Sequence, residues 1–341
     1  MADLWEDLDS LVKSPSSFSA KPGERGTIKP KSNFDAEDDA VKLRKAIEGL
    51  GTDEKTLIDI LTHRSNAQRQ LICEAYQAAT GRTLLEDLEG DTDGEFKNIL
   101  VALITPPATY DCHEIMRAIK GVGANCDVLI EIFASRSTEQ IAALNEVYLK
   151  ETEKKLIFDL KREVSGDFAK GLLLLAEGLR DGGTDVDEEK AREDAQILYN
   201  AGEKKWGTDE SKFIEILCQR NIFQLRQTLV EYKTIGGNTL QESIKKEMSG
   251  DLRELLVAIV KCVKSVPIYF AERLRGSMKG AGTDEWTLNR IMVSRSEIDL
   301  LDIRAEYKKL YEHSLHSAIE SDCGGDYRKT LLKICGGDDE S

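Results

Sequence analysis

The sequence has little of what most enzymes and membrane-spanning proteins need. It has four histidines, and its seven cysteines form no CxxC pair, so neither a zinc site nor a disulfide framework is indicated. Apolar runs stay well short of the roughly 18 residues of a membrane span, and none of signal-peptide length opens the chain. The six prolines in 341 residues leave room for many uninterrupted helices. We therefore expect a cytoplasmic protein with reduced cysteines, whose contact with membranes is peripheral.

The charge balance restricts the partners. The formal net charge is −15 and the pI is near 4.9, so nucleic acids and anionic lipid surfaces should repel the chain unless a cation or a basic patch intervenes. Hydrophobic residues make up 40% of the sequence, which is enough to form a core. We expect no nucleic-acid partner, and any binding to anionic membranes needs a cationic intermediary.

Internal repetition is the strongest signal in the sequence. A glycine-containing turn recurs at four anchors: Gly51, Gly123, Gly207 and Gly282. Thirteen residues after each anchor stands an arginine: Arg64, Arg136, Arg220 and Arg295. Twelve residues further stands a tyrosine: Tyr76, Tyr148, Tyr232 and Tyr307. Forty residues after each anchor comes an acid: Asp91, Glu163, Glu247 and Asp322. Three residues after each acid comes another glycine: Gly94, Gly166, Gly250 and Gly325.

Each repeat reads as five helices, and no segment alternates with period two, so we predict an all-α fold of four homologous five-helix repeats. In the first repeat a helix covers 35–48, Thr52 caps the second helix, and Ser65 caps the third. Gly81 ends the third helix, and the fifth stops at Pro106-Pro107. The predicted organisation is an N-terminal arm (1–34), repeats at 35–106 and 107–178, a linker (179–190), and repeats at 191–265 and 266–341.

The glycines and the acid together indicate a calcium site in each repeat. Glycine lets backbone carbonyls turn outward, and carbonyls with a carboxylate are the hard oxygen ligands that calcium prefers. Three carbonyls and one bidentate carboxylate give about five of the six to eight oxygens that calcium takes, which leaves room for a lipid phosphate. A glycine after a helix is usually a mere C-cap, and a lone acid is usually solvated. The fixed separation, found four times, outweighs that explanation.

These residues resemble the repeats of the annexin family, whose signature is (M/L)KGxGT, then DE, an RS pair, and an acid about 40 residues on. The last unit, SMKGAGTDEWTLNRIMVSRSEID, is the most similar, and the resemblance covers roughly Asp35 to Asp339. It implies a curved disc with calcium loops on a convex, membrane-facing side. The implied metal ligands are, by repeat, Ile47, Gly49, Gly51 and Asp91; Ile119, Gly121, Gly123 and Glu163; Gly202, Lys205, Gly207 and Glu247, in a variant loop; and Met278, Gly280, Gly282 and Asp322.

The sequence departs from the family pattern in places. Ala124 and Asn125 replace Thr-Asp in the second repeat, so we expect that repeat to lose its helix cap, and Asn221 stands where serine is usual. We expect the four repeated arginines to bind buried carbonyls near the loops. Some annexins have been discussed as ion conductors through a polar axis, but an internal salt-bridge cluster explains the same side chains better: Asp111, Glu114, Glu131, Arg136 and Arg290.

The arm and the third loop carry two further predictions. The apolar residues of the arm fall on one helical face that could dock in a small EF-hand protein or on the core of the chain: Leu4, Trp5, Leu8, Leu11 and Val12. Trp206 lies inside the third loop, where the other repeats have Leu50, Val122 and Ala281. Because tryptophan favours the bilayer interface, we predict that Trp206 contacts the membrane.

Three classes of function remain to be compared. An enzyme is not indicated, because the four histidines occupy unrelated repeat positions: His63, His113, His313 and His316. A helical protein-interaction scaffold would explain the repeats but not the acid at a fixed offset from every glycine turn. The sequence therefore predicts calcium-dependent binding to anionic phospholipid membranes, with Ca²⁺ as the bound ion and a role in membrane organisation or trafficking.

Overall fold

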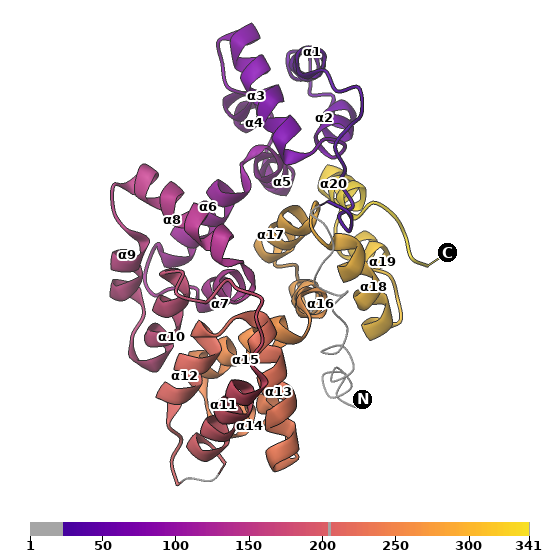
Figure 1. The fold of residues 1–341 in the computed structure, drawn as a ribbon. Helices are drawn as coiled ribbons and strands as arrows, with labels where there is room; N and C mark the ends of the chain where they lie inside the picture. The colour runs from indigo at the N-terminus through magenta and orange to yellow at the C-terminus, as the bar shows by residue number, and fades with distance from the viewer. Residues whose placement is uncertain (1–22, 204–205, 341) are drawn as a thin grey trace. The chain divides into compact units, whose positions relative to one another are not determined.

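A computed structural model describes residues 23–203 and 206–340, and the N-terminal arm up to residue 22 lies outside the described residues. The described part consists of 20 helices and contains no strand, as predicted (Figure 1). It divides into two compact units. Unit 1 is Asp111–Tyr269, and unit 2 comprises the described residues of Ala20–Tyr110 and Phe270–Ser341.

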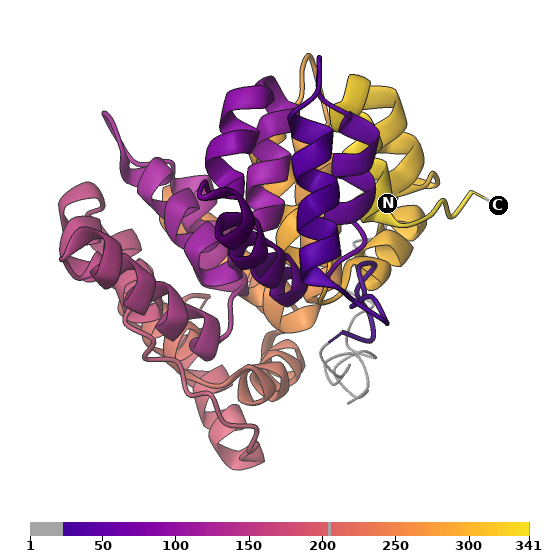
Figure 2. The ribbon, with the colours of Figure 1, turned by 90° about the horizontal axis from the view of Figure 1, so that it is seen from above.

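Unit 2 contains the first and fourth repeats. The helices of the first repeat are α1 (Ala36–Ile47), α2 (Glu54–Leu61), α3 (Asn66–Thr80), α4 (Leu84–Asp91) and α5 (Gly94–Ile104). Those of the fourth are α16 (Val266–Ser277), which begins before the unit boundary, α17 (Glu285–Arg295), α18 (Leu300–Tyr311), α19 (Leu315–Asp322) and α20 (Gly325–Cys335). Figure 2 shows the two sets side by side, and α5 packs against both α17 and α20.

Unit 1 contains the second and third repeats. The helices of the second repeat are α6 (Pro107–Ile119), which begins before the unit boundary, α7 (Cys126–Ser135), α8 (Thr138–Thr152), α9 (Leu156–Glu163) and α10 (Gly166–Ala176). Those of the third are α11 (Glu188–Ala201), α12 (Glu210–Gln219), α13 (Ile222–Gly236), α14 (Leu240–Glu247) and α15 (Gly250–Lys264). Here α15 packs against α7 and α10 of the second repeat.

Most helix ends follow the local chemistry of the sequence. Ser65 and Gln68 form a reciprocal capping box at the start of α3, and Gly81 ends that helix in the left-handed conformation (φ 72°), as predicted. On α1, Val41 is 61% exposed, whereas Ala40 and Leu43 are buried. The third helix of the fourth repeat begins late, because the carbonyl of Ser296 accepts hydrogen bonds from the amides of Thr27 and Ile28.

Two predicted caps are wrong. The second helix is capped by Asp53, whose side chain accepts a hydrogen bond from the amide of Thr56, and not by Thr52. The hydrogen bonds from the Thr56 hydroxyl and amide hold the pKa of Asp53 below its usual range. The second repeat keeps its cap, because the side chain of Asn125 accepts from the amide of Val128.

The repeated arginines bind mainly carboxylates, so the expectation that they bind carbonyls near the loops is wrong. Arg64 donates two hydrogen bonds to Asp39, of 2.6 and 2.8 Å, and both side chains are buried. The same bidentate pairing joins Arg136 to Asp111 and Arg220 to Asp194. Each pair ties the first helix of a repeat to the end of its second helix.

In the fourth repeat the corresponding arginine, Arg295, has different partners. Phe270 occupies the place of the aspartate, and the guanidinium of Arg295 lies 4.8 Å from the centre of its ring. Arg295 takes its carboxylate from Asp299, with two hydrogen bonds of 2.8 Å. None of the described helices is long and apolar enough to cross a membrane.

Candidate calcium sites

The four glycine loops are closed by the same backbone hydrogen bond. The amide of Asp53 donates to the carbonyl of Ala46 (2.8 Å), and two other loops repeat this spacing: Asn125 to Ala118 (2.7 Å) and Asp284 to Ser277 (2.8 Å). In the third repeat the bond runs from Asp209 to Ala201 (2.9 Å), so this loop is one residue longer. The longer span agrees with the variant loop expected there.

Glycine is required in these loops by the backbone. The following loop glycines have positive φ: Gly51 (89°), Gly121 (109°), Gly123 (82°), Gly207 (85°), Gly280 (114°) and Gly282 (105°). A Cβ on any of them would meet no atom within 4 Å, so space is not the reason for glycine. Side chains disfavour this conformation, which turns successive peptide groups in directions that a helix cannot provide. Such loops can present carbonyl oxygens to a cation.

In three repeats the fold brings the end of the acid-bearing helix to the loop. A threonine that follows the loop glycine reaches the end of the helix carrying the acid, 39 residues away in sequence. The Thr52 hydroxyl donates to the carbonyl of Asp91 (3.1 Å), and the Thr208 hydroxyl lies 3.4 Å from both the carbonyl and the carboxylate of Glu247. In the fourth repeat Thr283 donates directly to the carboxylate of Asp322. These hydroxyls are functional candidates that the sequence alone does not reveal, since it predicts only a capping role, and only for Thr52.

The second repeat lacks this connection. Ala124 occupies the threonine position, so the backbone loop has no hydroxyl with which to reach Glu163. Since a single hydrogen bond typically contributes about 1 kcal/mol, the second loop should be held less firmly against its acid than the other three.

We therefore expect Ala124→Thr to strengthen the second site. In a chain whose other three acids are replaced by alanine, this substitution should lower the calcium needed for vesicle binding about fivefold, the equivalent of about 1 kcal/mol. A calcium titration with anionic vesicles measures the change, with Ala124→Ser as a control of intermediate size. An unchanged titration would show that the threonine link has no part in the site.

The chemistry of the donors fits calcium. The described residues contain no group of three or more His, Cys, Asp or Glu side chains that could hold a metal ion. In the fourth repeat, burial raises the pKa of Cys323, next to Asp322, to about 11. The donors that the loops and their acids offer are carbonyl and carboxylate oxygens, which calcium prefers.

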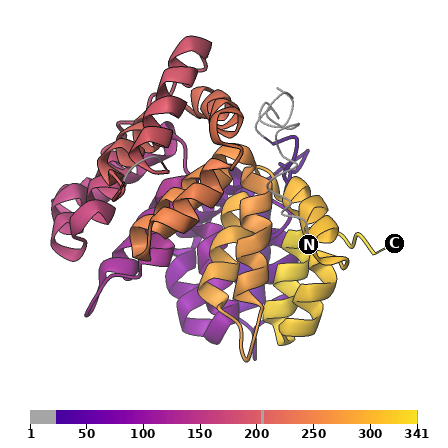
Figure 3. The ribbon, with the colours of Figure 1, turned by 90° about the horizontal axis from the view of Figure 1, so that it is seen from below.

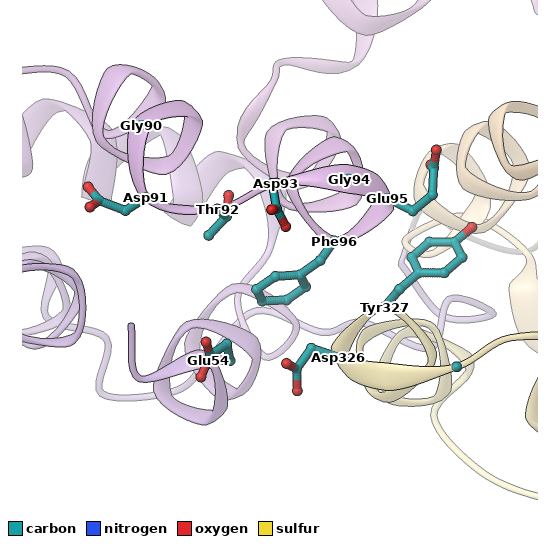
Figure 4. A pocket seen from close by; sticks show the side chains of 11 residues that line it. Glu54, Gly90, Asp91, Thr92, Asp93, Gly94, Glu95, Phe96, Asp326 and Tyr327 are labelled. Atoms are coloured by element: carbon teal, nitrogen blue, oxygen red, sulfur yellow. The ribbon is translucent and has the colours of Figure 1, made fainter. Parts of the chain in front are cut away.

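An acidic cavity adjoins the first site within unit 2. It has a volume of about 560 Å³ and runs from Asp91 to Phe96 on one side and along Asp326 and Tyr327 on the other. Figure 4 shows the Phe96 ring in the middle of the cavity, with the carboxylates of Asp93, Glu54 and Asp326 around it. Clustered carboxylates raise the local concentration of cations, so this cavity favours calcium near the first loop.

The loops extend from their helices with their tips exposed. Figures 2 and 3 show the loop after α1 and the loop after α16 at the same end of unit 2. The residues at three of the tips are fully exposed: Leu50 (113%), Val122 (109%) and Trp206 (104%). Among the predicted carbonyl donors, the side chains of Ile47 and Met278 are buried, whereas Lys205 lies outside the described residues.

An all-helical array of four repeats, three of which join a glycine loop to an acid-bearing helix through a threonine hydroxyl, is typical of a class of metal-dependent binding proteins. The Annexin family model matches residues 38–103, 110–175, 193–259 and 269–334. The chain is 56% identical to annexin A3 of Bos taurus over 317 residues, which is 93% of this chain and 98% of that protein. It is 50% identical to annexin A5 of Gallus gallus, again over 93% of this chain and 98% of that protein.

Solved structures give the same result. The structure of annexin III, 55% identical, aligns with a TM-score of 0.92 over 93% of this chain and 99% of that chain. A calcium-bound annexin (Sm)1, 36% identical, aligns with a TM-score of 0.84 over 92% of this chain and 93% of that one. The chain belongs to the annexin family. Membership implies calcium-dependent, peripheral binding to phospholipid, and annexins are in general not enzymes.

Proposed function

We propose that this annexin attaches to anionic phospholipid membranes when calcium rises, with one calcium ion per repeat bridging the protein to lipid phosphates. The observation that carries the proposal is the hydroxyl link between the loop threonine and the acid, present in three repeats. It ties the helix end that carries the acid to a loop that can supply carbonyl oxygens. The cation then joins a chain of charge −15 to a surface of the same sign.

The ligands proposed for each site are three loop carbonyls and one carboxylate. By repeat they are Ile47, Gly49, Gly51 and Asp91; Ile119, Gly121, Gly123 and Glu163; Gly202, Lys205, Gly207 and Glu247; and Met278, Gly280, Gly282 and Asp322. One carboxylate per site gives weak binding of calcium alone, because ligand charge sets the affinity. Lipid that completes the shell raises calcium affinity, and calcium raises lipid affinity by the same factor.

The functional units are the predicted repeats, 35–106, 107–178, 191–265 and 266–341, joined by the linker 179–190. We place the protein in the cytoplasm, where it would organise or traffic membranes during calcium signals. The apolar residues predicted in the N-terminal arm would bind either a small EF-hand protein or the core of the chain itself. A helical scaffold for protein partners is the second candidate, and it would not require calcium.

Vesicle sedimentation tests the proposal. The protein should sediment with phosphatidylserine-containing vesicles in calcium, return to the supernatant when a chelator is added, and ignore pure phosphatidylcholine vesicles. Binding that persists in chelator would favour the scaffold or a purely electrostatic contact, and no binding in calcium would contradict the proposal.

Trp206 should move into the headgroup region on binding. Its side chain is fully exposed within the third loop, and a tryptophan ring is stabilised at the bilayer interface. With Trp5 and Trp286 replaced by phenylalanine, calcium and anionic vesicles together should shift Trp206 emission to the blue and expose it to bilayer-embedded quenchers. Emission that neither calcium nor lipid alters would show that Trp206 stays in water.

A further inference from the structure

The fourth helix of the second repeat, α9, has an unusual surface. Phe158 is 58% exposed on this helix. Positions three and four residues away lie beside a residue on a helix surface. The positions that follow within α9, Lys161 and Arg162, are basic and exposed. Lys154 and Lys155, directly before the helix, are basic and exposed as well. We call these five residues the α9 basic face.

The four basic side chains of this face are not paired with acids within the described structure. None of the four forms an ion pair with a described carboxylate, although acids outnumber bases in the chain. The nearby acid Asp159 points elsewhere, because its carboxylate accepts a hydrogen bond of 2.5 Å from Tyr148. Leu156 and Leu160 form the buried side of α9. The helix therefore has an apolar inner side and a basic outer side with an aromatic ring at its centre.

The basic residues at the start of α9 lower the stability of the helix. In the other repeats the corresponding helix begins with a hydroxyl cap, at Thr83, Thr239 or Ser314. In α9 the cap position is Lys155, which makes no capping hydrogen bond. Positive charge at a helix N-terminus is also unfavourable, because it opposes the helix dipole. Helix stability therefore does not explain Lys154 and Lys155.

The same positions in the other repeats are different in kind. Where α9 has Phe158, helices α4, α14 and α19 have Glu86, Glu242 and Ser317. Where α9 ends in Lys161-Arg162 before Glu163, α4 ends in Glu89-Gly90 before Asp91. Helix α14 also ends in two exposed basic residues, Lys245-Lys246, before Glu247. The features particular to the second repeat are therefore Phe158 and the two lysines that precede the helix.

We propose that the α9 basic face is a second contact for anionic phospholipid, in addition to the calcium bridge at Glu163. The inference rests on the proposed function, since calcium must first bring the acidic chain to the membrane. A basic helix face with an exposed aromatic residue matches the boundary between headgroups and acyl chains. The face ends at Glu163, so it is continuous with the second calcium site. It supplies a direct attraction to lipid in the repeat whose loop lacks the threonine link.

The contribution should be measurable. A basic residue near an anionic leaflet strengthens binding about fivefold. Replacing all four basic residues with glutamine should weaken the partition onto phosphatidylserine vesicles, at fixed calcium and physiological ionic strength, by a factor on the order of ten or more. The matched control replaces four exposed lysines on other helices with glutamine and should change the partition little: Lys45, Lys190, Lys309 and Lys333.

A second variant reports the position of the face itself. Phe158→Trp, with all three native tryptophans replaced by phenylalanine, should shift its emission to the blue and become accessible to bilayer-embedded quenchers in calcium with phosphatidylserine vesicles. Phe158 and the four basic residues are exposed, and circular dichroism checks that both variants keep their helical content.

Three outcomes would overturn the proposal. The first is that the face variant and the matched control partition equally onto vesicles. The second is that the Phe158→Trp side chain stays in water when the protein is bound. The third is that the face variant loses self-association but keeps lipid binding. The last outcome would identify the face as a contact with another copy. Failure of the unmodified chain to bind vesicles in calcium would instead contradict the proposed function.

Discussion

Alanine in place of all four acids that end α4, α9, α14 and α19 should abolish calcium-driven sedimentation with anionic vesicles and leave helical content intact. The acids are Asp91, Glu163, Glu247 and Asp322. Each is the sole carboxylate proposed for its site, so its loss leaves neutral carbonyls that bind calcium weakly. The acids lie at helix ends and outside the buried core, so the fold should survive. Sedimentation across a calcium titration, with circular dichroism on the same samples, measures both effects.

Two controls accompany this variant: one has the same change in net charge, and the other replaces the acids one at a time. A control with the same change in net charge replaces four other exposed acids: Glu89, Glu146, Glu189 and Glu320. It should bind at least as well as the unmodified protein. Single replacements should only raise the calcium required, because linked sites compensate for one another. If the chain without its four acids still sediments in calcium, the assigned carboxylates are wrong.

The second large effect concerns stability. Asp39→Ala should lower the free energy of unfolding of unit 2 by about 3–5 kcal/mol, because it leaves the guanidinium of Arg64 buried and without its carboxylate. The side chains of Asp39 and Arg64 are 3% and 8% exposed, and two hydrogen bonds join them. Denaturant unfolding followed by circular dichroism measures the change.

The neighbouring acid supplies the control. Asp38 pairs with Lys42 on the exposed side of the same helix, with side chains 54% and 55% exposed. Asp38→Ala should change stability little, since water and salt screen exposed pairs. Equal losses in the two variants would mean that burial of the Arg64–Asp39 pair contributes nothing.

The sequence predicts the repeats and the loops because their chemistry is local. The glycine loops depend on backbone conformations that only a few residue types tolerate, so they stand out at fixed spacing. The Ser65 capping box and the Gly81 terminus follow from neighbouring residues for the same reason. Fold class, family and bound ion could therefore be reached from the sequence.

Contacts between positions far apart in the sequence cannot be predicted from local chemistry. Asp39 precedes Arg64 by 25 residues, and the pairing depends on how two helices pack. The role of Thr52 was misjudged for the same reason: its hydroxyl reaches a helix 39 residues away, while Asp53 caps the local helix. A repeated side chain can be recognised in the sequence, but its partner is identified by the fold.

The fourth repeat shows that identical residues can have different partners. Arg295 matches the other repeated arginines in position, yet it packs on Phe270 and pairs with Asp299. The sequence does show that the upstream aspartate is missing, because Phe270 stands at that position. The alternative carboxylate, one helical turn after the arginine, becomes evident only because the next helix begins at Leu300.

Counting calcium ions tests the central claim most directly. Equilibrium dialysis with radioactive calcium, in the presence of anionic vesicles, gives the number of ions bound per chain. Each of the variants Asp91→Ala, Glu247→Ala and Asp322→Ala should bind one ion fewer than the unmodified protein at the same free calcium, and the chain without all four acids should bind four fewer. An unchanged number in these variants would contradict the account of one acid-dependent calcium bridge in each repeat.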